Sequence, residues 1–300
     1  MAKQSTMRAL PVLLALGLVA WGLLPGVASA DEKAKELYNQ GVTAMQAGKL
    51  DDAVLAFKGA IASDGNYFDA YLNLGAVYFQ KKQYDDAAKM LQSATEKNPK
   101  SIEAFSSLGR VQYVLNRFVE AQMAYKSALA LDPKNASLYK ELAKVCLKQG
   151  NSTELVATIQ KCHELGGADE QTYFWLGKGL EKEDKTTEAL AAYHKSIKLK
   201  AKNYEAQFAV GKIYLGQENY DGAAKAFRSA LTADPKGFRA AYNYAVAMES
   251  KDQEATDQNI ANWKEFVRIA QGNPKANGDV QVAKQHIKEL EDAKKAKQGL

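Results

Sequence analysis

Proline is scarce in this chain once residues 1–30 are set aside. The sequence has 300 residues and 6 prolines, and two of these, Pro11 and Pro25, lie within that segment. Proline breaks a helix interior, so the remaining chain can form long helical arrays. Hydrophobic residues make up 46% and charged residues 25%, which is neither a disordered nor a membrane composition.

The residues and motifs that catalysis or metal binding requires are also scarce. The three histidines, His163, His194 and His286, are widely separated, and there are only two cysteines. The sequence contains no H-E-x-x-H, no G-x-S-x-G and no glycine-rich phosphate loop. We therefore expect no enzyme activity, no metal site and no cofactor.

An excess of charge of one sign is missing as well. The formal net charge is +5, and Lys3 and Arg8 of the N-terminal segment account for two of these charges. A nucleic-acid-binding domain usually has a strongly basic patch and a high pI. The balanced charge argues against nucleic acid as a partner.

The N-terminal segment, residues 1–30, has the pattern of a cleaved secretory signal peptide. Residues 1–8 are basic, residues 9–24 are uncharged and mostly apolar, and Ala28-Ser29-Ala30 forms an A-x-A cleavage site. A membrane span needs about 20 apolar residues, so an uncleaved N-terminal membrane anchor is the alternative. No second long apolar run follows. The sequence predicts a periplasmic or secreted protein, with a Gram-negative envelope favoured.

Small residues recur with a 34-residue period. Large apolar residues and prolines keep the same register. The three series are Gly41, Gly75, Gly109, Ala143, Gly177, Gly211 and Ala245; Phe57, Leu91, Tyr125, Ile159, Tyr193 and Phe227; and Pro99, Pro133 and Pro235. Two helices approach closely only where side chains are small, and a proline in this register ends the second helix of its unit. One helix pair buries too little apolar surface alone, so several must stack.

This pattern resembles the tetratricopeptide-repeat (TPR) family. The best single match is Tyr71-Leu72-Asn73-Leu74-Gly75 followed by Tyr84-Asp85-Asp86-Ala87 and Asn98-Pro99. The resemblance implies an all-α fold, a right-handed superhelical α-solenoid of about seven helix pairs with a C-terminal capping helix. The predicted units are 34–67, 68–101, 102–135, 136–169, 170–203, 204–237 and 238–274, the last with an insertion, and 275–300 form the capping helix and tail.

Two units depart from the pattern. The fourth has Ala143 in place of glycine and Gly166-Gly167 in place of Asn-Pro, which could loosen its joint to the fifth. In the seventh, polar residues 252–259 displace the second helix. The predicted last helix covers about 279–297, with Val282, Ala283, Ile287 and Leu290 as its apolar stripe.

The resemblance implies that the first helix of each unit lines a concave groove, with its second, fifth, sixth, ninth, twelfth and thirteenth residues pointing inward. The ninth positions include four cations in register. We expect these to bind partner carboxylates, two asparagines to hold a partner's backbone, and three aromatic residues to act as anchors. The candidates are Arg110, Lys144, Lys178 and Lys212; Asn73 and Asn243; and Phe174, Trp175 and Phe208.

Each of these assignments has a simpler alternative. Lysine is common on any solvated helix face, and Glu141 and Glu181 dilute the positive charge of the row. Trp175 could instead pack against the irregular fourth unit.

The two cysteines, Cys146 and Cys162, lie late in two antiparallel helices. This offsets them by about 10 Å along the axis, too far for a disulfide.

The sequence thus predicts a non-catalytic scaffold of the cell envelope that binds partner segments in its groove. The expected partners are proteins or peptides, in particular acidic ones or ones with a free C-terminal carboxylate. We expect no nucleic acid as a partner and no stable membrane insertion after signal removal. The alternative is a structural subunit of an envelope, secretion or pilus assembly complex that makes contact through its convex face or C-terminal helices.

Overall fold

The computed structural model describes residues 29–252, 254, 256–297 and 299. It divides into two compact units, one ending at Tyr67 and one beginning at Phe68. The predicted signal peptide falls almost wholly on residues 1–28, which lie outside the described residues.

The described part of the first unit is one helix pair, α1 (Ala30–Gln46) and α2 (Leu50–Ser63). The ring of Phe57 is buried where the two helices meet, and a Cβ at Gly41 would lie 2.6 Å from it. The Ser29 hydroxyl caps α1 by accepting a hydrogen bond from the Glu32 amide, while the Glu32 carboxylate accepts one from the Ser29 amide. This capping box spans the predicted cleavage site after Ala30.

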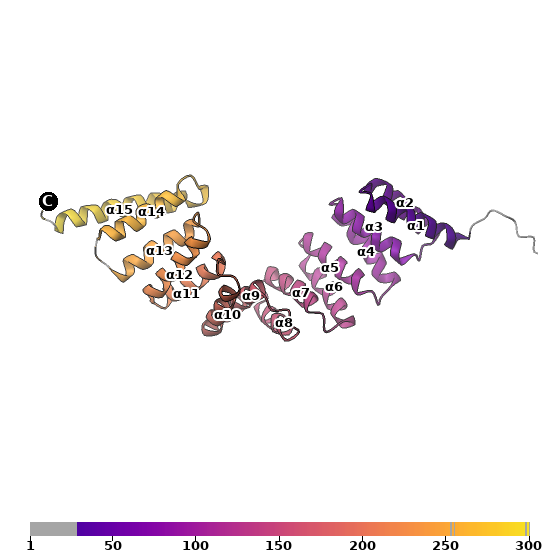
Figure 1. Cartoon of the computed structure of the whole chain (residues 1–300), viewed down its shortest axis with the longest axis horizontal. Coiled ribbons are helices and arrows are strands. Elements are labelled where there is room, and N and C mark those ends of the chain that lie inside the picture. The colour runs from indigo at the N-terminus through magenta and orange to yellow at the C-terminus, as the bar shows by residue number, and fades with distance from the viewer. Residues whose placement is uncertain (1–28, 253, 255, 298, 300) are drawn as a thin grey trace, which may run out of the picture. The chain divides into compact units, whose positions relative to one another are not determined.

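The second unit continues the series with helices that each pack against the next one in the chain (Figure 1). They form the consecutive antiparallel pairs that the sequence predicts, and the described residues contain no strand, so the all-α prediction is confirmed. The helices are α3 (Phe68–Gln80), α4 (Tyr84–Lys97), α5 (Ile102–Val114), α6 (Phe118–Leu131), α7 (Ala136–Gln149), α8 (Ser152–Glu164), α9 (Glu170–Lys182), α10 (Thr186–Leu199), α11 (Tyr204–Gly216), α12 (Tyr220–Ala233), α13 (Phe238–Lys251), α14 (Asp257–Ala270), the 3-10 turn η1 (Pro274–Ala276) and α15 (Asn277–Lys297).

The recurring glycines lie where the two helices of a pair touch. A Cβ at Gly75 would come within 2.7 Å of Leu91, and one at Gly177 within 2.5 Å of the Tyr193 ring. Both distances are shorter than real Cβ contacts, so the helices cannot approach this closely with a side chain there. The repeat period of the sequence therefore reflects one repeated helix contact.

In the second unit, the turn inside each pair from α3–α4 to α11–α12 uses a left-handed residue with the same period. Lys82, Asn116, Asp184 and Glu218 have φ values of 58° to 59°, and Gly150 takes the equivalent position in the fourth pair. The amide that follows bonds back to a carbonyl five residues earlier, as Gln83 does to Tyr78, which ends the helix in a Schellman motif.

At the joint between the fourth pair, α7–α8, and α9, Gly167 lies against side chains of both helices of the pair. That Gly166-Gly167 loosens this joint stays a prediction. A Cβ at Gly167 would lie 2.6 Å from the Cys162 sulfur and 2.9 Å from the Cβ of Ala136. Glycine is needed here because the chain passes directly over these side chains. An ion pair between Lys140 and Asp169 further connects α7 to the residue just before α9.

The two cysteines are buried free thiols, as predicted. Cys162 donates from its thiol toward the carbonyls of Ala136 and Gly167. Burial raises the pKa of Cys146 to about 11, which leaves little of the reactive thiolate at neutral pH.

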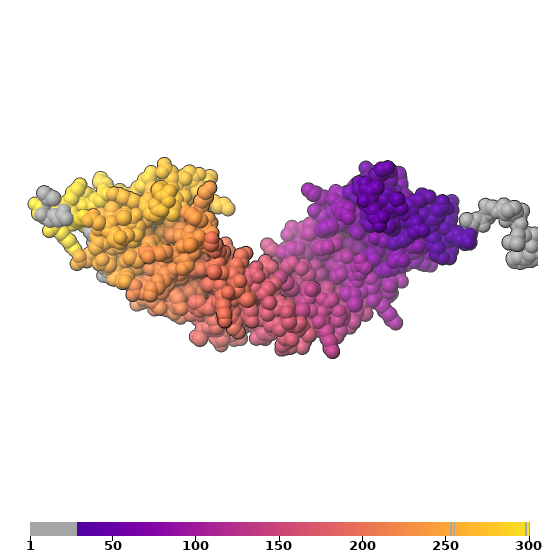
Figure 2. All heavy atoms as spheres, in the orientation of Figure 1, coloured from indigo at the N-terminus to yellow at the C-terminus, as the bar shows by residue number. Residues whose placement is uncertain are grey.

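The C-terminal residues, yellow in Figure 2, close the second unit, and α15 packs against α14. The polar stretch before α14 is held by Asn259, which is 1% exposed and donates to the carbonyls of Asp252 and Glu254. The predicted stripe of α15 was wrong at one position. Val282 is 65% exposed, and Val280 is buried instead with Ala283 and Ile287.

No helix among the described residues is long and apolar enough to span a membrane.

Candidate functional site

The first helices of the second unit share one face. Contacts between successive first helices recur at α3–α5, α5–α7, α7–α9 and α11–α13. The positions that the repeat pattern points inward therefore lie beside one another. We call this surface the inner face.

The first hollow on the inner face lies between α3, α5 and α7 and has a volume of about 530 Å³. We call it the first basin. Most of its lining comes from the predicted inward positions, and Tyr125 of α6 contributes from the second helix. Its lining residues are Phe79, Ser106, Ser107, Arg110, Tyr113, Val114, Tyr125, Ser137, Leu138, Glu141 and Lys144.

The charge of the first basin is nearly balanced. Lys144 forms an ion pair of 2.6 Å with Glu141 on the same helix. Arg110 lies over the ring of Phe79, 4.9 Å from its centre. Among the described residues that line this basin, Arg110 is therefore the cation available to a ligand.

The second hollow lies between α9, α11 and α13 and has a volume of about 390 Å³. We call it the second basin. Four cations line it against two carboxylates, so it carries a positive excess. Its lining residues are Phe174, Lys178, Glu181, Lys182, Tyr193, Glu205, Phe208, Ala209, Lys212 and Arg239.

Two cations of the second basin rest on aromatic rings instead of carboxylates. The Lys178 ammonium lies 5.8 Å from the centre of the Phe174 ring, and the Arg239 guanidinium 4.7 Å from that of Phe208. Neither forms an ion pair with any described residue. A cation over a ring face is held in place by the ring's quadrupole yet keeps its charge and donors for another ligand.

Glu181 organises the floor of the second basin. Its carboxylate accepts a hydrogen bond of 2.8 Å from the hydroxyl of Tyr193 and lies 3.7 Å from the Lys212 ammonium. Burial, together with this bond to a carboxylate, raises the pKa of Tyr193 well above its ordinary value. The phenol therefore stays protonated and keeps donating to Glu181. Lys212 is partly neutralised, which leaves Lys178, Lys182 and Arg239 as the charges open to a ligand.

The apolar anchors behave differently from one another. Trp175 is 7% exposed and packs with Tyr125, Leu138 and Leu142, so the alternative in which it fills space beside the fourth unit is the one observed. A helix turns by about 100° per residue, so its neighbour Phe174 faces the second basin instead. Phe208 lines the same basin, but it is only 5% exposed, and Arg239 lies over its ring.

The two asparagines chosen to hold a partner's backbone bond to their own helices. The Asn73 amide donates to the carbonyl of Asp69, and the Asn243 amide to the carbonyl of Arg239. In each case the acceptor lies four residues earlier. A role in binding stays a prediction for both.

Sequence reasoning missed Arg239 and Lys182, although a signal for both was present. They occupy the second and thirteenth inward positions of their units, whereas the candidates came from the fifth, sixth and ninth. Arg239 belongs to the second basin because its side chain extends from α13 to the Phe208 ring on α11.

The described residues of the inner face offer binding groups for a ligand. No group of three or more histidine, cysteine, aspartate or glutamate side chains in the described part of the chain could hold a metal ion. The inner face presents backbone groups, cations and aromatic ring faces, which recognise charged and apolar groups of a ligand.

Helix pairs of one repeat length stacked in order, with glycine at the contact and a lined inner face, define a tetratricopeptide-repeat protein. The profile of the family described as the Cilia and flagella-associated protein 70 C-terminal domain matches residues 1–257, and the chain belongs to this family. No curated protein matches the sequence.

Solved structures show the same fold. A C-terminal part of a TPR repeat-containing protein from Cytophaga hutchinsonii is 17% identical and covers 80% of this chain and 98% of its own, with a TM-score of 0.63. YrrB, described as a TPR protein with an unusual peptide-binding site, is 21% identical and covers 65% and 99%, with a TM-score of 0.54. MamA is 23% identical and covers 57% and 93%, with a TM-score of 0.53.

Proposed function

We propose that this protein is a scaffold that holds an acidic segment of a partner protein on its inner face, with the second basin as the anchor point. The observation that carries this proposal is the pair of cations without a carboxylate partner, Lys178 and Arg239, each positioned over an aromatic ring at the rim of one hollow. A TPR fold is typical of protein–protein interaction.

The second basin suits a carboxylate for two reasons. Arg239 offers a planar fork of donors that matches a carboxylate in two bonds. Lys178 and Lys182 lie one helical turn apart on α9 and add point charges on the same rim. Charge complementarity of this kind steers association and depends on salt.

The direct test uses a fluorescent peptide of alternating glutamate and alanine with a free C-terminus, and a second peptide in which glutamine replaces each glutamate. The full chain should bind the acidic peptide and ignore the glutamine peptide. A Lys178→Glu/Arg239→Glu variant should weaken binding by about tenfold, which corresponds to about 1.4 kcal/mol. Raising the salt concentration should weaken the parent's binding in the same direction.

The matched control is Lys198→Glu/Lys202→Glu, which changes the net charge equally on exposed residues of α10 and the turn that follows it. This variant should bind as the parent does. Equal loss in both variants would mean that only overall charge matters, and equal binding of both peptides would remove the acidic ligand from the proposal.

We further propose that the protein acts outside the cytoplasm, in the cell envelope. The N-terminal residues 1–30 support this through their basic, apolar and A-x-A pattern. N-terminal sequencing of the protein from fractionated cells should give Asp31 as the first residue of the exported form. A chain that keeps residues 1–30 and sediments with membranes would support the anchored alternative.

A structural role in an assembly complex is the second candidate. Val119 and Met123 lie one turn apart on α6 and are 62% and 65% exposed. Exposed apolar side chains on a second helix favour contact through the outer surface. A partner captured from envelope extract that is lost with Val119→Ser/Met123→Ser and kept by the second-basin variant would favour this candidate.

A further inference from the structure

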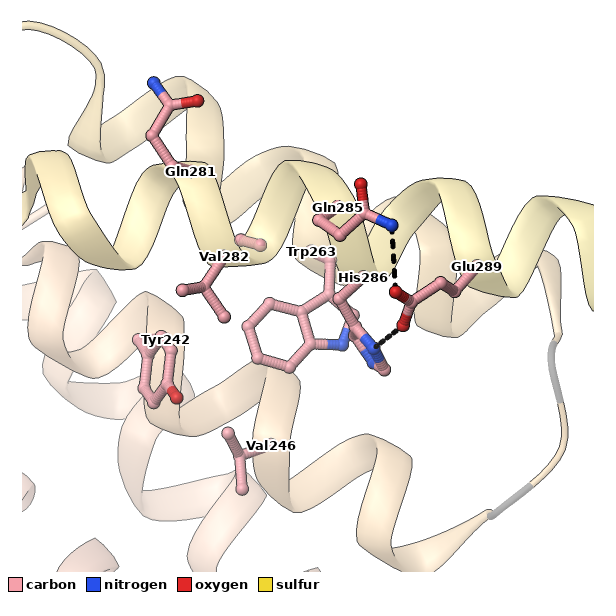
Figure 3. Close-up of a pocket in the computed structure, with 9 residues that line it drawn as sticks. Tyr242, Val246, Trp263, Gln281, Val282, Gln285, His286 and Glu289 are labelled. Carbon is pink, nitrogen blue, oxygen red and sulfur yellow. Dashed lines mark hydrogen bonds and ion pairs between the residues drawn. The ribbon is translucent and has the colours of Figure 1, made fainter.

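A third hollow of about 610 Å³ lies among α13, α14 and α15 (Figure 3). We call it the third basin. It shares α13 with the second basin, and its lining differs in charge and in shape. The residues that matter are Tyr242 and Val246 of α13, Trp263 of α14, and Val282, His286 and Glu289 of α15.

Aromatic rings form the walls of the third basin. The ring centres of Tyr242 and Trp263 are 5.4 Å apart with planes at 80°, and those of Trp263 and His286 are 5.3 Å apart, also at 80°. Figure 3 shows the indole between the other two rings, with Val282 pointing toward it. Trp263 itself is 6% exposed, so the partly buried rings of Tyr242 and His286 border the open space. The face of an aromatic ring attracts cations.

Two carboxylates flank this cage. Glu249 accepts a hydrogen bond of 2.8 Å from the Trp263 indole and contacts the His286 imidazole at 2.9 Å. Glu289, whose side chain is 61% exposed, lies 3.8 Å from the other imidazole nitrogen. No lysine or arginine is among the described residues that line the hollow. Two carboxylates face one imidazole, so acidic side chains outnumber basic ones at this site.

An alkyl stem also has a place in this site. Val282 is exposed beside Tyr242 and Val246, although it lies on the helix that covers the core. Arginine and lysine bury their methylene stems along apolar surface while the charged head stays near water. Arginine additionally stacks on aromatic faces and pairs with carboxylates through a planar fork.

From these observations we infer that the third basin binds an arginine side chain of a partner protein, with the stem along Val246 and Val282, beside the Tyr242 ring, and the guanidinium at the exposed Glu289 carboxylate. Arg239 of the second basin and Val246 lie seven residues apart on α13, which is about 10 Å. An extended partner segment covers this distance in about three residues. On the basis of the proposed function, the partner segment would therefore carry an acidic residue about three positions from an arginine.

The indole N–H of Trp263 reports on this site directly, because it donates to Glu249 at the wall of the basin. The full chain labelled with ¹⁵N-tryptophan would be titrated with Nα-acetyl-arginine methylamide and, separately, with Nα-acetyl-norleucine methylamide, which has an uncharged stem. The arginine probe should shift the Trp263 signal saturably and at least about fivefold more tightly than the norleucine probe, from the combined ring and carboxylate contacts. The Trp175 signal should not move.

Two variants of exposed α15 residues sharpen the test without touching the core. Glu289→Gln should reduce the preference for arginine over norleucine to less than about twofold, while Asp292→Asn, which removes the same charge from the same helix, should leave it intact. Equal affinity for both probes, or a preference that survives Glu289→Gln, overturns the inference.

The result does not depend on the second basin, because neither probe carries an acidic group. A second experiment joins the two sites with peptides that place two glutamates three residues before or after an arginine, compared with norleucine at that position. A preference for arginine that persists in Lys178→Glu/Arg239→Glu would retain the third basin while removing the proposed role of the second.

Discussion

The first and second basins are made from the same repeat positions, yet they present different charges. In the first, the ninth-position Lys144 is paired with Glu141 at 2.6 Å. In the second, the ninth-position Lys178 rests on Phe174 and keeps its charge. The comparison teaches that repeat register decides which way a side chain points, whereas the neighbours at other inward positions decide whether it is free to bind.

The largest expected difference between the two basins is the stability cost of adding a side chain at the glycine beneath each one. A Cβ at Gly177 would lie 2.5 Å from the Tyr193 ring, while one at Gly109 would lie 3.0 Å from the Tyr125 ring. Because Tyr193 is fully buried and bonded to Glu181, it cannot move aside. Gly177→Ala should lower the free energy of unfolding by about 2–3 kcal/mol and Gly109→Ala by about 1 kcal/mol. Urea unfolding measures the free energy of unfolding of both variants. Equal losses would show that the two glycine contacts are equally tight.

The second largest expected difference is the stability contribution of the tyrosine hydroxyl below each basin. Tyr193 donates to the Glu181 carboxylate, and hydrogen bonds to charged groups contribute about 1.5–3 kcal/mol. Tyr193→Phe should therefore destabilise the protein by about 1.5 kcal/mol. Tyr125→Phe should change stability by less than about 0.5 kcal/mol, since no described residue hydrogen-bonds to that hydroxyl. Thermal and urea unfolding of the two variants decide whether the Glu181 contact stabilises the second floor.

Charge-reversal variants compare how much the cations of each basin contribute to binding of the acidic peptide. Lys178→Glu/Arg239→Glu should weaken binding of the acidic peptide about tenfold, and Arg110→Glu/Lys144→Glu about threefold, because Lys144 is already neutralised in the parent. Fluorescence anisotropy at two salt concentrations provides the dissociation constants. A larger effect of the first-basin variant would move the anchor point to the first basin.

Away from the basins, the two regions should respond alike. Lys82 before α4 and Glu218 before α12 both have left-handed backbone, with φ of 59° and 58°. Side chains disfavour this conformation by about 1 kcal/mol, and glycine accepts it freely. Lys82→Gly and Glu218→Gly should each raise the unfolding free energy by somewhat less than about 1 kcal/mol. Unequal gains would show that the turns are not equivalent and that the difference between the regions extends beyond their charges.

Much of the fold could be predicted because the residues that form one helix contact recur in several repeats. The glycine at 75, 109, 177 and 211 and the large residue sixteen positions later identified the same helix contact in each pair. The exceptions had a local reason. In the sequence Gly167 is only a departure from the repeat, and the structure shows that the chain needs glycine there to pass over Cys162 and Ala136. Val282 was placed in a buried stripe, but α15 packs with Val280 inward.

The candidate site could be predicted only in outline. The inward positions follow from the period, so Phe174, Lys178 and Lys212 were expected to face one surface. All three line the second basin, and their role in binding stays a prediction. Trp175 was not separable from Phe174 by sequence, because either neighbour could turn toward the core. Asn259, taken as part of a polar insertion, is buried through bonds to two loop carbonyls that lie five and seven residues before it.

The sequence by itself determined the helix pairs, their order and the set of first-helix positions that line the inner face, since these depend on residues one repeat apart or closer. Only the tertiary structure decided which cations remain without a carboxylate partner, that Arg239 joins Lys178 in one basin, and that Tyr242, Trp263 and His286 enclose another. Those properties depend on side chains from helices that are distant in sequence and become neighbours only when the pairs stack. Ion pairing and ring contact are distances in space, and a repeat pattern does not encode them.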